Sequence, residues 1–205
     1  MGMDIVSFLK TNEAFGGLSN MSGEFPIAVN GVRVLTSEHL YQALKFPDHP
    51  DVQKSILSKP SPIHCKMIAK SKVNREKVRK DWEDVQLEVM EFCLKVKLLY
   101  HWVKFGNLLR ASEGKEIVEI SSKKDTYWGK KNSDEGLVGE NHLGKLLMKL
   151  RDELLGECNE HLRIASPPAH LNLRFLGEEI REKDRRAHLR QVGTATTVLV
   201  NELRP

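Results

Sequence analysis

The most regular pattern in the chain is an apolar residue at every third or fourth position from about Asp81 to Tyr100. That spacing places the apolar side chains on one face and predicts the longest helix of the protein. The members of this stripe are Trp82, Val85, Val89, Phe92, Val96 and Leu99. A second stripe begins after Asn141, a residue that can cap a helix start. Its members are Leu143, Leu146, Leu147, Leu150 and Leu154.

Alternating apolar residues flank Asn30-Gly31 on both sides. Asn-Gly suits a tight turn that needs positive φ, so residues 25–35 are predicted to form a β-hairpin. A short strand is also predicted at Ile117–Ile120. Residues 1–14 carry little signal, and Lys130–Glu140 is interpreted as a polar loop.

The hairpin leads directly into Thr36–Phe46, which is predicted to be a short helix capped by Thr36 or Ser37. At 100° per residue, one face carries an acid, a phenol, an amide and an amine, and the other is apolar. The polar face consists of Glu38, Tyr41, Gln42 and Lys45. Two interpretations fit this face: a solvated surface, which is the common case, or a catalytic cluster.

Further helices are predicted at Val52–Leu57, from Ser61 to about Ala69, and over His101–Arg110. Ser71–Lys80 is strongly basic. Such a run usually forms a solvated face, and a phosphate-facing role is the other interpretation.

The composition is that of a globular protein, with 40% hydrophobic and 29% charged residues among 205. The length suggests one domain with an appendage. A net charge of +4 is compatible with a phosphate-bearing partner without demonstrating one. We expect no membrane association, because no run of about 18 uncharged apolar residues occurs. The three dispersed cysteines and the lack of a signal-peptide pattern favour the cytoplasm.

The character of the chain changes after Gly156, so we predict a domain over residues 1–155 and an extension of unknown role over 156–205. Within the extension, Gly177–Arg190 resembles a solvated helix, and Thr194–Val200 is a candidate edge strand or contact with another chain.

Several kinds of site are disfavoured by residue spacing. No cysteine pair or His-Glu-x-x-His pattern is present, so we expect no metal. The Gly-x-Ser-x-Gly elbow of acyl-transfer enzymes and the glycine fingerprint of dinucleotide-binding proteins are also missing. We therefore expect no cofactor.

An ordered series of short motifs resembles the NADAR, or YbiA-like, family over about Phe15–Leu155. The most specific motif is Ser-Glu-His-x-Tyr-Gln-x-x-Lys-Phe at 37–46, together with Asp-x-x-Trp-Gly at 125–129. The others are Leu18-Ser-Asn20, Asn30-Gly31, Ser61-Pro62, Trp82, Val96-Lys97, Val118-Glu119 and Gly139-x-Asn-x-Leu-Gly-x-x-Leu-Met-x-x-Arg151.

The resemblance implies a compact, mostly helical α+β domain that cleaves N-glycosidic bonds. Two substrate classes are known in the family: a phosphoribosylamino-pyrimidine of riboflavin synthesis, and ADP-ribose attached to guanine, including guanine in DNA. The expected partner is therefore an ADP-ribosylated nucleic acid or a phosphoribosyl small molecule. A non-catalytic module that binds ADP-ribose or nucleic acid is the alternative from another class. The oligomeric state is left open.

The sequence departs from the riboflavin-type pattern where that pattern has phenylalanines, a Gly-Arg pair and a further glycine. The departures are Leu18, Met21, Cys65, Ile68-Ala69, Leu98 and Lys131. These changes favour the ADP-ribosyl substrate, because a dedicated metabolic enzyme is expected to keep its small-substrate contacts.

N-glycoside cleavage passes through an oxocarbenium-like ribose, which a carboxylate can stabilise while an acid protonates the leaving nitrogen. We assign Glu38 and Asp125 to these roles. Lys45 is the candidate nucleophile or charge partner of Glu38, and Lys97 is the second candidate. The positions assigned to substrate binding are Asn20, Tyr41, Gln42, Phe46, Trp82, Lys97, Trp128, Gly129, Asn141 and Arg151.

Overall fold

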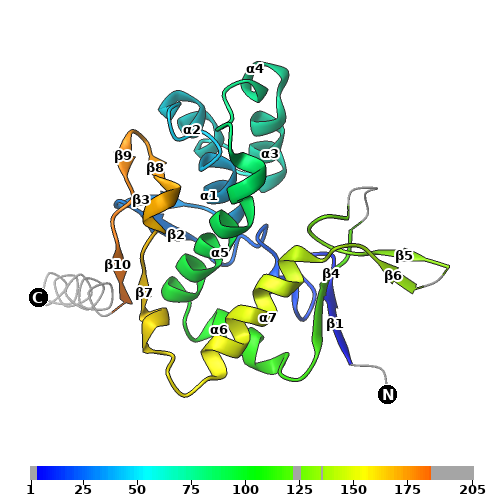
Figure 1. The fold of residues 1–205 in the computed structure, drawn as a ribbon. Helices are drawn as coiled ribbons and strands as arrows, with labels where there is room; N and C mark the ends of the chain where they lie inside the picture. Colours follow the sequence, from blue (N-terminus) through cyan, green and yellow to red (C-terminus); the bar gives the residue numbers. More distant parts are fainter. Residues whose placement is uncertain (1–3, 122–125, 135, 186–205) are drawn as a thin grey trace, which may run out of the picture.

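The long predicted helix, α5 (Trp82–Tyr100), is the central element of the fold. The computed structural model describes residues 4–121, 126–134 and 136–185. In Figure 1, α5 runs between α1 (Ser37–Ala43), α7 (His142–Leu155) and the strand β7 (Ile164–Ala165), and it contacts all three. Because it is covered on several sides, α5 buries more residues than its one predicted stripe.

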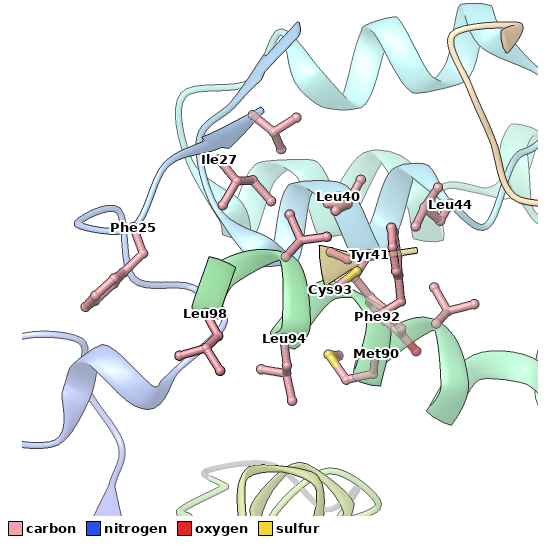
Figure 2. Packing of buried hydrophobic residues seen from close by; sticks show 14 of the residues in the cluster. Phe25, Ile27, Leu40, Tyr41, Leu44, Met90, Phe92, Cys93, Leu94 and Leu98 are labelled. Carbon is pink, nitrogen blue, oxygen red and sulfur yellow. The ribbon is translucent and has the colours of Figure 1, made fainter. Parts of the chain in front are cut away.

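Figure 2 shows the packing between α5 and α1. Leu40, Tyr41 and Leu44 lie over Cys93 and its neighbours on α5, and all of these side chains are at most 3% exposed. Burying one such large apolar side chain stabilises the fold by about 1.5–3 kcal/mol. The short helix that carries the polar motif is therefore fixed from behind by the core.

The remaining predicted helices are present with small shifts at their ends. They are α2 (Pro50–Leu57), α3 (Pro62–Lys70) and α6 (Lys104–Ala111). A further short helix, α4 (Lys72–Arg75), was not predicted from the sequence. The basic segment after Ser71 thus contains α4, which packs against α3 at the upper end of the molecule in Figure 1.

The described strands form two-stranded ladders. The predicted hairpin is confirmed as β2 (Ile27–Val29) and β3 (Val32–Val34). Its two turn residues, Asn30 and Gly31, have φ of +48° and +82°, as this tight turn requires.

One strand was missed by the pattern analysis. β1 (Ile5–Phe8) pairs in parallel with β4 (Glu116–Glu119), from Ile5 opposite Glu116 to Phe8 opposite Glu119. The pairing joins segments more than one hundred positions apart, so no local turn announces it. Four residues are also too short for their alternation to stand out.

The predicted polar loop at 130–140 is instead a hairpin of β5 (Lys131–Ser133) and β6 (Gly136–Val138). The interpretation was wrong because both faces of this hairpin are largely exposed, so apolar and polar residues do not alternate along it. Figure 1 shows the hairpin projecting from the body near β4.

The predicted solvated helix after Gly177 is also wrong within the described residues. Leu176 and Gly177 have φ of +55° and +92°, which turns the chain between β8 (Arg174–Phe175) and β9 (Glu178–Glu179). β10 (Lys183–Asp184) then pairs with β7. The edge strand predicted at 194–200 lies outside the described residues.

The first part of the extension packs into the same core as the rest of the chain. Its buried apolar members are Leu162, Ala165, Leu171, Leu173, Phe175 and Ile180. Gln53 of α2 donates to the carbonyls of Ala43 and Arg174 at 3.2 and 2.9 Å, and it accepts from Leu176 N. The extension is thereby tied to the end of α1. No described helix is both long and apolar enough to cross a membrane.

Candidate active site

The start of α1 is fixed by Thr36, which caps the helix as predicted. Its Oγ1 accepts from His39 N at 3.2 Å. His39 is fully buried, with Nδ1 2.8 Å from Thr36 Oγ1 and Nε2 2.9 Å from the Lys59 carbonyl oxygen. Burial lowers the pKa of His39. This histidine therefore joins α1 to the α2–α3 connection. Glu38, the residue before it, is the second residue of α1 and lies in the first turn of the helix.

Glu38 is only 5% exposed and is held from three directions. Its backbone N–H donates to the Asn20 carbonyl at 3.1 Å, and its Oε1 accepts from Gln42 Nε2 at 2.7 Å. Lys66 Nζ, from α3, lies 3.5 Å from the same oxygen. The Glu38 carboxylate is therefore almost buried, yet it has both a cation and an amide as partners, as buried charged groups require.

The bond to Glu38 also orients Gln42, because its NH₂ group must face the carboxylate. Gln42 Oε1 and Asn20 Oδ1 are buried and have no hydrogen-bond partner among the described residues. Unpaired buried acceptors are unusual in folded proteins. Both can accept hydrogen bonds from the hydroxyl groups of a ribose.

Lys45 follows the end of α1 and lies over two aromatic rings. Its Nζ is 4.9 Å from the centre of the Trp82 ring and 5.3 Å from that of Tyr41. The pKa of Lys45 is lowered to about 8, chiefly by burial and further by Lys66 and Lys70, against the opposing charges of Glu38 and Glu83. A usable fraction of this amine is therefore neutral near pH 7.

Glu119, at the end of β4, is a second carboxyl group beside Glu38, and we did not assign it a role from the sequence. Burial raises its pKa to about 7, assisted by the negative charge of Glu38 and opposed by Lys66. Two nearby carboxylates resist simultaneous ionisation, which is how an acid stays protonated near neutral pH. The signal was present, since Val118-Glu119 is one of the matched motifs.

Gly129 lies directly against Glu119. A Cβ on Gly129 would come within 2.3 Å of the Glu119 carbonyl oxygen, so only glycine fits at this position. This close approach sets the neighbouring Trp128 against Tyr41, with ring centres 5.6 Å apart. Tyr41 also lies 5.0 Å from Trp82, so the three rings form a continuous aromatic wall.

We call this group the Glu38 cluster. It comprises Glu38, Tyr41, Gln42, Lys45, Lys66, Trp82, Glu119 and Trp128. It combines the ion-paired carboxylate of Glu38, the carboxyl group of Glu119 with its raised pKa, the amine of Lys45 with its lowered pKa, and aromatic rings beside them. That set of groups can protonate a leaving nitrogen, stabilise a cationic sugar and contact a flat base.

Four residues predicted to bind substrate have other positions. Phe46 is fully buried in the core. Arg151 Nη1 donates to the carbonyls of Ser112 and Lys115 at 2.8 and 2.7 Å. Asn141 begins α7 as predicted, yet its Nδ2 donates to the Ile117 carbonyl at 2.8 Å and its side chain makes no capping bond. These groups hold the backbone around β4 and α7.

Lys97 is the fourth of these residues, and its side chain is enclosed by the core. Its Nζ donates to the carbonyls of Gly17 and Ser19 at 2.6 and 3.0 Å and lies over the rings of Phe25 and Phe105. Lys97 thus holds the loop that carries Asn20. Asp125, the second predicted carboxylate, lies outside the described residues.

Comparison with protein families gives a match to the NADAR domain over residues 7–155. The chain belongs to the NADAR family. The match agrees with the resemblance found in the motifs, and the observed mostly helical α+β fold is the one that it implied.

Among individual relatives, this NADAR protein is 36% identical to the N-glycosidase YbiA of Shigella boydii over 151 residues, covering 73% of this chain and 88% of the relative. It is also 36% identical to a chloroplastic riboflavin biosynthesis protein of Zea mays, covering 75% of this chain and 26% of that one. The NMR structure of YbiA from E. coli superposes with a TM-score of 0.64 at 35% identity, covering 78% of this chain and 90% of the other. These relatives support a general N-glycosidase function without selecting a substrate.

Proposed function

We propose that this NADAR protein hydrolyses the N-glycosidic bond of a ribosylated base, and that its substrate is an ADP-ribosylated guanine in DNA. The observation that carries the reaction type is the convergence of Glu38, Lys45 and Glu119 beside an aromatic wall. Each group has the charge or pKa that one step of glycoside cleavage needs.

Breaking the bond to the base requires a proton for the leaving nitrogen. Glu119, with a pKa of about 7, supplies it from its protonated form. The electron pair of the broken bond goes to the nitrogen, and the base leaves neutral. Positive charge then develops on the ribose, and the buried Glu38 carboxylate stabilises it.

The neutral Lys45 amine attacks the anomeric carbon as the base leaves. The new ammonium gives a proton to Glu38, Glu38 passes that proton to the ring oxygen as the sugar ring opens, and a protonated Schiff base forms. Water adds to its carbon and gives one proton to Glu119, and the C–N bond then breaks as the hydroxyl proton moves to the nitrogen. The free sugar, the neutral Lys45 amine and the protonated Glu119 are thereby regenerated. The low pKa of Lys45 favours this role over that of a simple charge partner for Glu38.

Binding is assigned to the neighbouring groups. The unpaired oxygens of Gln42 and Asn20 accept from ribose hydroxyls, and Trp128 contacts the base. Lys66, which lies 3.5 Å from Glu38, is assigned to a phosphate of the substrate.

The finer choice of ADP-ribosylated DNA rests on two features of this chain. Its motifs depart from the riboflavin-type pattern at several positions that surround the predicted small-substrate contacts. The basic segment of α3 and α4 also adjoins the Glu38 cluster through Lys66. A polyanionic substrate needs such a surface and a small metabolite does not.

A riboflavin-pathway phosphoribosylamino-pyrimidine is the second candidate substrate. Two relatives of this chain favour it, because both are named as riboflavin biosynthesis proteins. They are the Zea mays protein described above and a Vibrio vulnificus protein that is 33% identical over 151 residues. The same three groups would perform the same bond cleavage on it.

The test is to incubate the protein with ADP-ribosylated DNA and, separately, with the phosphoribosylamino-pyrimidine, and to measure the released sugar. We expect free ADP-ribose from the first and none from the Glu38→Ala and Lys45→Ala variants. Release from the pyrimidine alone would select the second candidate. Full activity in both variants would refute the catalytic assignment.

A further inference from the structure

The positive charge of the protein is concentrated in one segment. Residues 59–80 contain eight lysines and arginines and one acid, an excess of seven, whereas the whole chain has a net charge of only +4. The rest of the chain is therefore net negative. Charge gathered on one segment in this way is typical of a surface that meets phosphates.

The outward face of α3 combines these charges with exposed apolar groups. Ile63, Lys66, Met67 and Lys70 follow one another at i, i+3, i+4 and i+7, so they share one side of the helix. Ile63 is 60% and Met67 63% exposed, while Cys65 and Ala69 on the other side are buried.

The same combination continues on α4. Lys72 and Arg75 are exposed there, and Val73 between them is 77% exposed. We call this surface the α3–α4 strip. It comprises Ile63, Lys66, Met67, Lys70, Lys72, Val73 and Arg75.

Several cations of the strip are available for a partner. Lys70 and Lys72 form no ion pair with any described acid, and the Arg75 side chain donates, among the described residues, only to the Lys70 carbonyl, at 3.3 Å. By contrast, the cations that line the nearby groove of about 450 Å³ are largely paired with acids. Lys77 lies 3.5 Å from Asp51, and Arg79 lies 2.7 Å from Asp81. Arg174 is 3.9 Å from Asp48, so among the described residues Lys80 is the one cation of the groove without an acid partner, whereas the strip has three such cations in Lys70, Lys72 and Arg75.

The strip begins at the Glu38 cluster, because Lys66 belongs to both. From the structure we infer that a single strand of nucleic acid lies along the strip, with its phosphates on the lysines and Arg75 and its bases against the exposed apolar side chains. This inference rests on the proposed function and extends it to the part of the substrate beyond the reacting nucleotide.

A single strand fits better than a duplex because the reacting groups are recessed. Glu38 and Tyr41 are 5% and 3% exposed, so a base has to leave its stack to reach them. Extruding a base is least costly from a strand that is already unpaired. Apolar side chains beside the phosphate track also suit unstacked bases.

The inference is tested by binding of unmodified single-stranded DNA, which does not depend on catalysis. Lys72→Gln with Arg75→Gln removes two charges that lie outside the catalytic cluster. By fluorescence anisotropy, we expect the affinity to fall several-fold and the slope of log affinity against log salt to decrease by about 1.4. The matched control is Lys10→Gln with Lys145→Gln, which removes two exposed lysines elsewhere and should change neither quantity.

A second pair of substitutions separates the apolar contribution. Ile63→Ser with Met67→Ser should weaken DNA binding with little change in the salt slope, because apolar contacts release no counterions. Val103→Ser, at another exposed apolar position, is its control and should bind as the parent protein does.

The inference would be overturned if Lys72→Gln with Arg75→Gln and its control Lys10→Gln with Lys145→Gln lost the same affinity for DNA. It would also be overturned if the strip variant lost none. Loss of binding to phosphatidylserine vesicles with DNA binding intact would also overturn it, by assigning the strip to a membrane surface. If DNA binding depends on the strip but no ADP-ribose is released from modified DNA, the strip stands and the proposed reaction fails. If ADP-ribose is released from modified DNA but the affinity for DNA does not depend on the strip, the proposed reaction stands and the strip inference fails.

Discussion

Lys45 and Lys97 both carry an amine of lowered pKa against aromatic rings, at about 8 and about 7, yet their surroundings differ. The Lys97 amine uses its donors on two backbone carbonyls and is 1% exposed. The Lys45 amine is half-buried, and within residues 4–121, 126–134 and 136–185 no hydrogen-bond partner of its Nζ is found. A lowered pKa therefore does not by itself mark a catalytic lysine; the free donors do.

The electrostatic surroundings of the two lysines differ as well. Burial is the sole cause of the low pKa of Lys97. Lys45 is also influenced by two cations and by Glu38 and Glu83. We therefore expect Lys45 to control activity and Lys97 to control stability and the position of the Asn20 loop.

Replacing Lys45 should give the largest effect. Lys45→Met removes the nucleophile, so kcat/KM for release of ADP-ribose should fall by about 1,000-fold or more. The free energy of unfolding should not fall near pH 7, because no hydrogen bond is lost and burial of the charged amine, which lowers its pKa to about 8, disfavours the folded state there. Lys54→Met, at an exposed lysine of α2, is the control and should keep full activity. An active Lys45→Met variant would contradict the assignment of Lys45 to catalysis and of Lys97 to stability.

Replacing Glu119 should reduce kcat/KM by about 10² to 10⁴. The parent enzyme needs Glu119 protonated and Lys45 neutral, with pKa values of about 7 and about 8. Its rate should therefore rise up to about pH 7, stay level to about pH 8 and fall above that. Glu119→Gln should lose only the fall at high pH and reach its maximum above pH 8. An unchanged pH–rate profile would mean that another group donates the proton.

Lys97→Met should affect stability in a pH-dependent way. The pKa of Lys97 is about 7 when folded and 10.5 ordinarily, so the unfolded chain binds more protons between these values. The parent protein should therefore gain stability as pH rises above 7, by at most about 1.4 kcal/mol per unit from this group.

At pH 9 the neutral amine still donates to both carbonyls, and Lys97→Met leaves them unpaired. The variant should then be less stable than the parent by about 1–3 kcal/mol, and this deficit should shrink as the pH falls to 7. Denaturant unfolding at both pH values measures it. A deficit independent of pH would show that Lys97 is not titrating in the folded protein.

Trp128→Leu should have the smallest effect, because it changes binding and leaves the reacting groups in place. Loss of the aromatic contact with the base should raise KM by about fivefold, equivalent to about 1 kcal/mol, with kcat little changed. Trp102→Leu is the matched control, since this half-buried tryptophan contacts Arg163 outside the cluster. A large fall in kcat for Trp128→Leu would place this residue in the chemistry itself.

Local signals in the sequence predicted the helices and the first hairpin. Apolar periodicity located α5 and α7, the Asn30-Gly31 turn located the β2–β3 pair, and Thr36 marked the start of α1. Elements that depend on distant partners were missed. β1 becomes a strand only because β4 lies beside it, and the turn at Leu176 depends on its bond to Gln53.

The candidate site also contains residues that local sequence patterns could predict and residues that depend on distant parts of the chain. The face of Glu38, Tyr41, Gln42 and Lys45 could be predicted, because its residues share one short segment. Lys66 and Glu119 come from α3 and β4, and their importance arises from their electrostatic interaction with Glu38. Helix spacing also could not show that Lys97 is directed toward the Gly17–Ser19 carbonyls.

Reductive trapping tests the central claim most directly. The protein is incubated with ADP-ribosylated DNA in the presence of sodium cyanoborohydride, digested and analysed by mass spectrometry. If Lys45 forms a Schiff base with the sugar, the added mass of the reduced sugar adduct appears on the peptide that contains Lys45 and disappears in Lys45→Arg. An adduct on Lys97, or steady release of ADP-ribose by Lys45→Arg without any adduct, would contradict the account.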